Sequence, residues 1–196
     1  MMAQIDDDEL PGFKEYIQSR NGVDFISSSM MLSAVDAKLR LEMGEEKMLS
    51  EILEPLRDRY NVIIIDTAPT LEALNINALA AADEVIITVN PQLLAMMGLQ
   101  DFLKTVKKIR ARVNDRLSVA GILLTMYDAR TNLSLQVVEN VKDNLNQNIY
   151  KTIIPRNIRL AEAPSYGMPI NLYDPKSTGA TSYMLLAEEV IHKGEE

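Results

Sequence analysis

Short apolar runs alternate along this chain with longer segments of helical periodicity, and this alternation limits the folds available to it. Strands that alternate with helices of ten to fifteen residues predict an α/β fold with a mostly parallel sheet flanked by helices. The periodicity predicts helices over 13–20, 33–42, 45–58, 71–82, 98–113, 133–145 and 181–192. The apolar runs predict strands over 23–29, 62–65, 84–89, 121–126 and 151–155.

Composition excludes several classes of protein. The 196 residues carry a net charge of −8 and contain no cysteine, so disulfides and thiolate metal sites are excluded. The negative charge gives no overall attraction to nucleic acid or anionic lipid, and the acidic C-terminal helix disfavours membrane binding. No run is long enough to span a bilayer, and no signal pattern opens the chain. We therefore expect a cytoplasmic protein.

The length predicts one domain over 1–196. Residues 1–22 form a variable acidic segment in this interpretation, and 23–192 form the core. No internal repeat or low-complexity linker divides the core.

One carboxylate, Asp66, ends the most apolar predicted strand. In open α/β sheets, ligands bind beside the carboxyl ends of strands. A carboxylate there can hold a hydrated Mg²⁺, to which the hydroxyl of Thr67 can add. The alternative is that Asp66 caps the helix predicted from residue 71. An apolar run followed by Asp is also typical of a Walker B strand, although that pattern alone is only moderately specific.

The extended pattern resembles the ParA/Soj-type chromosome and plasmid partition ATPases, a deviant Walker branch of the P-loop NTPases. The likeness is carried, in the family's order, by IIIDTAPTLEALNINALAAADEVIITVNPQLLAMMGL, GILLTMYDARTNLSLQVVENV and IPRNIRLAEAPSYGMPINLYDPKSTGATSYMLLAEEV. It covers roughly 23–191. It implies a P-loop NTPase-like sheet, ATP and Mg²⁺ as cofactors, and ATP-dependent DNA segregation on the nucleoid. In that family an ATP-bound dimer coats DNA, and a ParB-type partner triggers hydrolysis.

The resemblance also implies roles for single positions. Asp66 matches the Walker B aspartate, which holds Mg²⁺ through water. The segment after it, which senses the γ-phosphate, is matched by Thr67, Ala68 and Pro69. Positions beside the adenine base are matched by Met126, Tyr127, Pro155, Arg156 and Asn157. Basic positions associated with non-specific DNA binding are matched by Arg130 and Arg159.

The family's phosphate loop, KGGVGKT, does not occur in these residues. None of the eight glycines lies in GxxxxGK[ST]. The backbone N–H groups of such a loop cradle the phosphates, and its lysines neutralise them. We therefore expect weak or absent ATP binding and little hydrolysis by this chain alone. A sheet without the family's first strand exposes a central edge, which predicts a homo-oligomer.

Three functions stay open at this point. The first is an active ATPase whose phosphate loop is unrecognised or supplied in trans. The second is a non-catalytic module that self-associates or binds a ParB-type partner. The third is a DNA-binding remnant that acts through Arg130 and Arg159.

The helix predicted over 98–113 raises a separate question because it is basic. A surface that faces DNA or a partner and an ordinary solvated face both explain this, and the second is favoured. The cations on it and just after it are Lys104, Lys107, Lys108, Arg110, Arg112 and Arg116.

Overall fold

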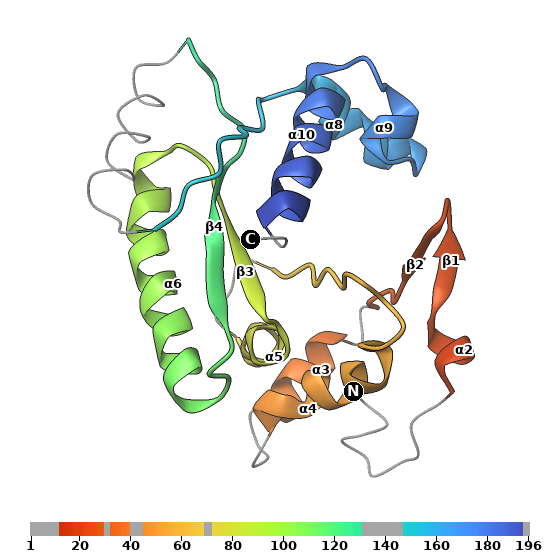
Figure 1. Cartoon of the computed structure of the whole chain (residues 1–196), viewed down its shortest axis with the longest axis vertical. Coiled ribbons are helices and arrows are strands. Elements are labelled where there is room, and N and C mark those ends of the chain that lie inside the picture. The colour runs from red at the N-terminus through yellow and green to blue at the C-terminus, as the bar shows by residue number, and fades with distance from the viewer. Residues whose placement is uncertain (1–11, 30–31, 40–44, 69–71, 131–146, 194–196) are drawn as a thin grey trace. The chain divides into compact units, whose positions relative to one another are not determined.

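The computed structural model describes residues 12–29, 32–39, 45–68, 72–130 and 147–193 (Figure 1). Contacts divide the chain into two compact units, each of which is described by itself. The first comprises Met1–Asp83 and Val106–Leu117, and the second comprises Glu84–Thr105 and Ser118–Glu196. This division groups contacts and does not test the expectation of a single domain, which stays a prediction.

The second unit contains a parallel sheet. Strand β3 (Glu84–Val89) pairs in parallel with β4 (Ser118–Leu124). The opposite edge of β4 bonds to the returning chain, because Ile122 N–H donates to Asn148 O at 2.8 Å and Tyr150 N–H donates to Ile122 O at 3.0 Å. Parallel pairing beside flanking helices confirms the predicted α/β class.

Strand β4 is buried on both faces, which explains its unbroken apolar sequence. On one face, Ile122 (0% exposed) and Leu124 (1%) pack with Leu99 of helix α6 (Leu93–Arg112). On the other face, Leu123 lies in a cluster against which helix α10 packs. Helix α10 (Thr178–Lys193) supplies the partly buried Leu186 and Val190 to that cluster.

Three short helices precede α10 in the second unit. The predicted pattern did not include them because they are too short to show a helical period. A close approach joins the first of them to α10, since a Cβ built on Gly179 would lie 2.6 Å from Leu160 Cγ. Their bounds are Ile158–Glu162 for α8, Ala163–Tyr166 for η3 and Ile170–Tyr173 for α9.

The first unit begins with a hairpin. Strand β1 (Gln18–Arg20) pairs antiparallel with β2 (Val23–Phe25). The turn residues Asn21 and Gly22 have φ values of 53° and 77°, the left-handed region that Asn-Gly turns of two-residue hairpins require. This turn explains why the helix predicted over 13–20 stops early, at the end of α2 (Phe13–Tyr16).

Besides this hairpin and the end of α6, the regular structure described in the first unit consists of short helices. Leu53, Leu56 and Ala81 form an apolar cluster in this unit. Two buried amides join the elements: Leu49 N–H donates to Asn77 Oδ1 at 3.0 Å, and Asn114 Nδ2 donates to Ala82 O at 2.7 Å. The helices are α3 (Leu32–Leu39), η1 (Glu45–Lys47), α4 (Met48–Leu53), η2 (Glu54–Leu56) and α5 (Ala73–Ala81).

The strand predicted over 62–65 was wrong. No helix or strand covers 61–68, and the side chains of Val62, Ile63 and Ile64 are 69%, 39% and 88% exposed. Of these four apolar residues, Ile65 is the one that packs against the cluster of Leu53, Leu56 and Ala81. Among the described residues, no backbone–backbone hydrogen bond joins 62–67 to another segment. A strand needs such a ladder, so an apolar run without neighbours does not become one.

Other predicted boundaries moved. The strand predicted over 151–155 was wrong as a continuous strand: within it, Pro155 forms an isolated bridge with Tyr127, and Ile154 N–H donates to Leu124 O at 2.9 Å. Helix α6 begins five residues before its predicted start and continues through Gly98, whose cost in a helix is only about 1 kcal/mol. The helix predicted over 133–145 lies outside the described residues.

No helix in the described ranges is both long and apolar enough to cross a membrane.

Candidate functional site

Asp66 and Thr67 lie in the first unit with exposed side chains. The Asp66 carboxylate makes no hydrogen bond or ion pair that the structure records with another described residue, which leaves its oxygens available to a cation. It does not cap α5, whose N-cap is Glu72, so the capping alternative fails for this helix. Across the part of the chain that the structure describes, no three carboxylate or imidazole side chains gather around a metal position. Pro69, which was also predicted to belong to this site, lies outside the described residues.

The segment after Asp66 is anchored to α5 by a side chain that sequence reasoning missed. Asn75, 7% exposed, donates from Nδ2 to Ala68 O at 2.6 Å. The carboxylate of Asp36, 8% exposed, accepts a hydrogen bond from Leu74 N–H at 3.2 Å. A signal for Asn75 was present in the sequence, because polar residues inside the otherwise apolar ALNINALAA of α5 need buried partners.

In the second unit, the structure brings together the residues that the resemblance places beside the adenine base. Tyr127 N–H donates to Ile154 O at 3.1 Å, and Arg156 N–H donates to Tyr127 O at 3.0 Å. These bonds place Met126 and Tyr127 alongside Pro155 and Arg156. The grouping follows from parallel chain directions, since Tyr127 and Pro155 form a parallel bridge.

Met126 has an unusual backbone. Its φ is 53°, a left-handed conformation that costs a residue with a side chain roughly 1–2 kcal/mol. Its side chain is 62% exposed, and its Sδ accepts a hydrogen bond from Nδ2 of Asn90 at 3.7 Å. Such strain is found disproportionately at functional sites.

Asn157 orders the start of α8. Its Oδ1 accepts from Arg159 N–H at 2.8 Å, which makes it the N-cap, and its Nδ2 donates to Thr178 Oγ1 at 2.7 Å. The guanidinium of Arg159 pairs with Glu162 at 2.9 Å and with Asp174 at 3.4 Å. Asn157 therefore holds the loop and α10 together, and Arg159 is paired with acids of its own unit.

Arg130 is also paired. Its Nε and NH2 groups donate to the two oxygens of Asp128 at 2.9 and 2.8 Å. These hydrogen bonds from Arg130 hold the pKa of the Asp128 carboxyl well below its usual range. A DNA phosphate would have to compete with these carboxylates for Arg130 and Arg159, and their DNA contact stays a prediction.

The predicted nucleotide-contacting residues thus form two groups. Asp66 and Thr67 belong to the first unit, and Met126 with 155–157 belongs to the second. Each group is ordered by hydrogen bonds within its own unit.

Known proteins are similar to this chain in sequence and in fold. The model of a family described as an AAA domain matches residues 6–119. The sporulation initiation inhibitor protein Soj of Bacillus subtilis is 45% identical over 172 residues, 88% of this chain and 68% of Soj. The chromosome-partitioning ATPase Soj of Treponema pallidum is 43% identical over 166 residues, 85% of this chain and 66% of that protein. The chain thus spans about two thirds of the length of these relatives.

A solved structure is also similar to this chain in fold. Cobyrinic acid a,c-diamide synthase from Mycobacterium smegmatis, with bound ATP analog and magnesium, matches with a TM-score of 0.82 and 27% identity. The match covers 99% of this chain and 72% of that one. Together with the relatives above, it confirms what the motifs indicated: the chain belongs to the ParA/Soj family.

Proposed function

We propose that this chain is a ParA/Soj-type partition module that keeps a Mg²⁺ ligand and a base-contacting loop but does not hydrolyse ATP alone. One contrast carries the proposal. The Asp66 carboxylate is exposed and open to a cation, whereas none of the 196 residues lies in a GxxxxGK[ST] loop that could hold phosphates. Its relatives include proteins named for chromosome partitioning, which supports the partition role.

The residues present fit some parts of Mg-ATP and not others. The Asp66 carboxylate and the Thr67 hydroxyl are the hard oxygen donors that Mg²⁺ prefers while it keeps several waters. In the second unit, Met126 and Pro155 offer an apolar surface to a base, and Arg156 adds an exposed donor. A triphosphate needs several positioned cations and N–H groups acting together, and the sequence supplies no such loop. No phosphoryl-transfer step is therefore assigned to this chain.

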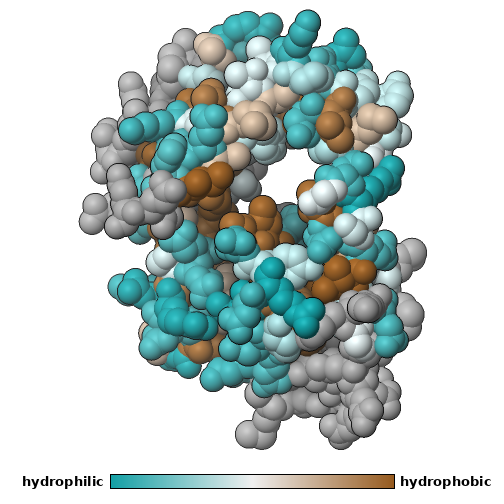
Figure 2. All heavy atoms as spheres, turned by 45° about the vertical axis from the view of Figure 1, so that its right-hand side comes forward, coloured by the Kyte–Doolittle hydropathy of each residue, from teal (hydrophilic) through white to brown (hydrophobic). Residues whose placement is uncertain are grey.

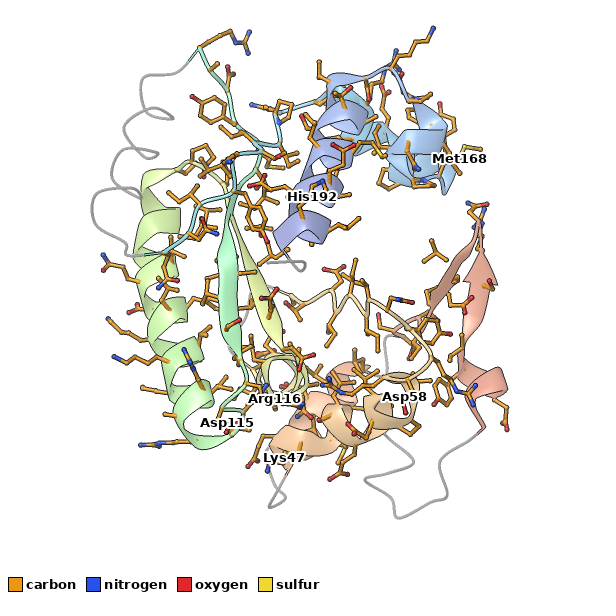
Figure 3. All side chains as sticks on the ribbon, viewed as in Figure 1. Lys47, Asp58, Asp115, Arg116, Met168 and His192 are labelled. Carbon is orange, nitrogen blue, oxygen red and sulfur yellow. The ribbon has the colours of Figure 1, made fainter. Side chains whose placement is uncertain are left out.

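A titration with Mg-ATP tests this proposal. We expect binding no tighter than about millimolar, which corresponds to roughly −4 kcal/mol, and no turnover. Asp66→Asn should remove the Mg²⁺ dependence of any binding that remains. Asp58→Asn is the matched control, because Asp58 is an exposed carboxylate eight positions earlier (Figure 3). Turnover by the parent chain that D66N abolishes and D58N spares would overturn the proposal.

A second candidate role, self-association, is favoured by the exposed apolar run Val62, Ile63 and Ile64. Contiguous apolar side chains on a protein surface mark interaction sites. Figure 2 shows, in brown, where apolar residues reach the surface on one face of the molecule. We propose that a second copy covers this run. Light scattering should show a larger particle for the parent than for Ile64→Lys, while Ile191→Lys, at a side chain 60% exposed on α10, should change nothing. A parent chain that is monomeric by light scattering would rule out self-association as its role.

A ParB-type partner remains part of the proposal on the strength of the family membership alone. Co-purification of this chain with a ParB-type protein from the same genome would support it. No stable complex at micromolar concentrations of both would count against it.

A further inference from the structure

The outer edge of strand β3 has no strand beside it in the part of the chain that the structure describes. Strand β4 occupies one edge of β3, and no further strand of the described residues pairs with β3 (Figure 1). The far edge of β4 is covered by the returning chain, through the backbone bonds of Ile122 with Asn148 and Tyr150. The edge of this sheet that remains open therefore belongs to β3.

The sequence of β3 favours pairing at this open edge. Its six residues read EVIITV, with a high preference for strand, one charge, and neither the Lys nor the Pro that blunt natural edge strands. The irregularity in the sheet comes from an extra residue on β4, Ala120, so β3 itself is unbroken. Glu84, Ile86 and Thr88 are exposed. Unpaired backbone groups on such an edge are a template for the addition of another strand.

The same chain carries an apolar run that has no strand partner. Residues 62–65 read VIII, and among the described residues no backbone–backbone hydrogen bond joins them to another segment. The side chains of Val62 and Ile64 are 69% and 88% exposed. The hairpin strands β1 and β2 are poorer acceptors for this run, because each has only three residues and they carry the charges of Arg20 and Asp24. The edge of β3 is the acceptor that matches the run in length and in apolar character.

Charge selects the orientation of such a pair. A parallel alignment of RYNVIIID (59–66) with DEVIITVN (83–90) superposes the two apolar runs. It places the Arg59 cation near the Glu84 carboxylate, which is favourable. An antiparallel alignment would instead bring Asp66 near Glu84, and like charges on neighbouring strands repel. The parallel alignment is therefore preferred, as it is between β3 and β4.

We infer that residues 62–65 of one copy add to the outer edge of β3 in a second copy as a parallel strand. The inference rests on the self-association proposed above, and it names the surface that covers the apolar run. The bonds come from backbone N–H and C=O groups of both segments, and the contact requires no nucleotide. Pairing between copies supplies the neighbouring strand without which 62–65 stays irregular.

Cysteine cross-linking between copies tests the pairing. The chain contains no cysteine, so a disulfide formed between two single-cysteine variants reports one contact. Ile86→Cys is mixed with Val62→Cys, and Thr88→Cys is mixed with Ile64→Cys, the pairs that the parallel alignment places side by side. Neighbouring strands lie about 4.8 Å apart, within the Cα distances of roughly 4.4–6.8 Å that a disulfide spans. Isotope labelling of one variant in each mixture identifies the mixed disulfide by mass.

A control variant in the same unit measures chance collisions. Ile191→Cys replaces Ile86→Cys in the mixture with Val62→Cys, because Ile191 is a 60% exposed side chain on α10. We expect about tenfold less mixed disulfide in this control, since paired strands raise the effective concentration of the two thiols. Equal cross-linking by Ile86→Cys and Ile191→Cys would overturn the inference. Preferential linking of Thr88→Cys to Asn61→Cys would mean an antiparallel strand and would contradict it as well.

Light scattering separates this inference from the self-association on which it rests. Ile86→Lys puts a charge on the edge, as natural edge strands do, and should be monomeric at concentrations where the parent associates. Circular dichroism shows whether the variant is folded; if it is not, the cross-linking decides. If Ile64→Lys is monomeric while folded Ile86→Lys associates like the parent, another surface covers the run, so the inference fails and self-association stands. A monomeric parent would overturn both.

Discussion

Two apolar segments of this chain have similar composition and opposite structures. Residues 62–65 read VIII, and the side chain of Ile64 is 88% exposed in the absence of a strand. Strand β3 reads EVIITV, pairs along its length with β4, and buries Ile87 to 8% exposure. Both runs are rich in β-branched residues, so their intrinsic preference for strand is alike. The difference shows that a neighbouring strand, more than the sequence of the run, decides whether it becomes a strand.

The largest expected effect is a difference in the free energy of unfolding that is lost when each segment is mutated. Ile122 is 0% exposed at the centre of the paired sheet, so Ile122→Ala should cost about 2–5 kcal/mol. Ile64→Ala, at an exposed position of the unpaired segment, should change stability by no more than about 0.5 kcal/mol. Urea denaturation of both variants measures this. Similar losses at the two positions would show that residues 62–65 are packed after all.

A smaller effect should come from a close contact in the paired region. A Cβ on Gly121 would lie 2.9 Å from Tyr150 Cε2 and 3.1 Å from Asn148 O. Gly121→Ala should therefore destabilise by about 1–3 kcal/mol, as overpacking does. Gly98→Ala is the control: nothing lies within 4 Å, and Ala in a helix should stabilise by up to about 1 kcal/mol. If both substitutions stabilise the protein, the space around Gly121 is larger than the structure shows.

The sequence correctly predicted those elements of the fold that pair or pack with other elements of the same chain. It predicted β3, α5 and the parallel pairing, because the partners of those elements lie in the same chain. The family resemblance also implied that Met126 and 155–157 lie near each other, and backbone hydrogen bonds of Tyr127 with Ile154 and Arg156 place these segments side by side. It failed at 62–65, because an apolar run does not reveal whether a partner exists. It missed Asn75, because a side chain that anchors Ala68 O leaves only a weak polar signal.

The pH dependence of stability should also distinguish the paired region. Burial raises the pKa of the Tyr150 phenol above its ordinary 10.0, and Glu84 and Glu189 add to this. A raised folded-state pKa gives stability that is complete below about pH 10 and is lost as pH rises through the folded value. The Tyr150→Phe variant should therefore lose less stability than the parent between neutral and strongly alkaline pH. If the stability of the two proteins falls equally as pH rises, the loss does not come from Tyr150, and the prediction is contradicted.

The smallest effect concerns the paired arginines. Because Arg130 and Arg159 already bond to acids of their own unit, R130Q/R159Q should weaken any DNA binding of the parent by less than about tenfold at low salt. Gel shifts at low salt with matched protein concentrations measure the difference. A loss of about tenfold or more from the double variant would identify these arginines as the main DNA contact.

Hydrogen exchange at the backbone tests the central claim most directly. At protein concentrations low enough to keep the chain monomeric, amides of 62–65 should exchange as in an open chain, with and without millimolar Mg-ATP. Amides of 86–89 should be protected by roughly a hundredfold or more, since they belong to a hydrogen-bonded sheet. Protection of 62–65 equal to that of 86–89 would contradict the account, because it would show that the segment before Asp66 already has a strand partner.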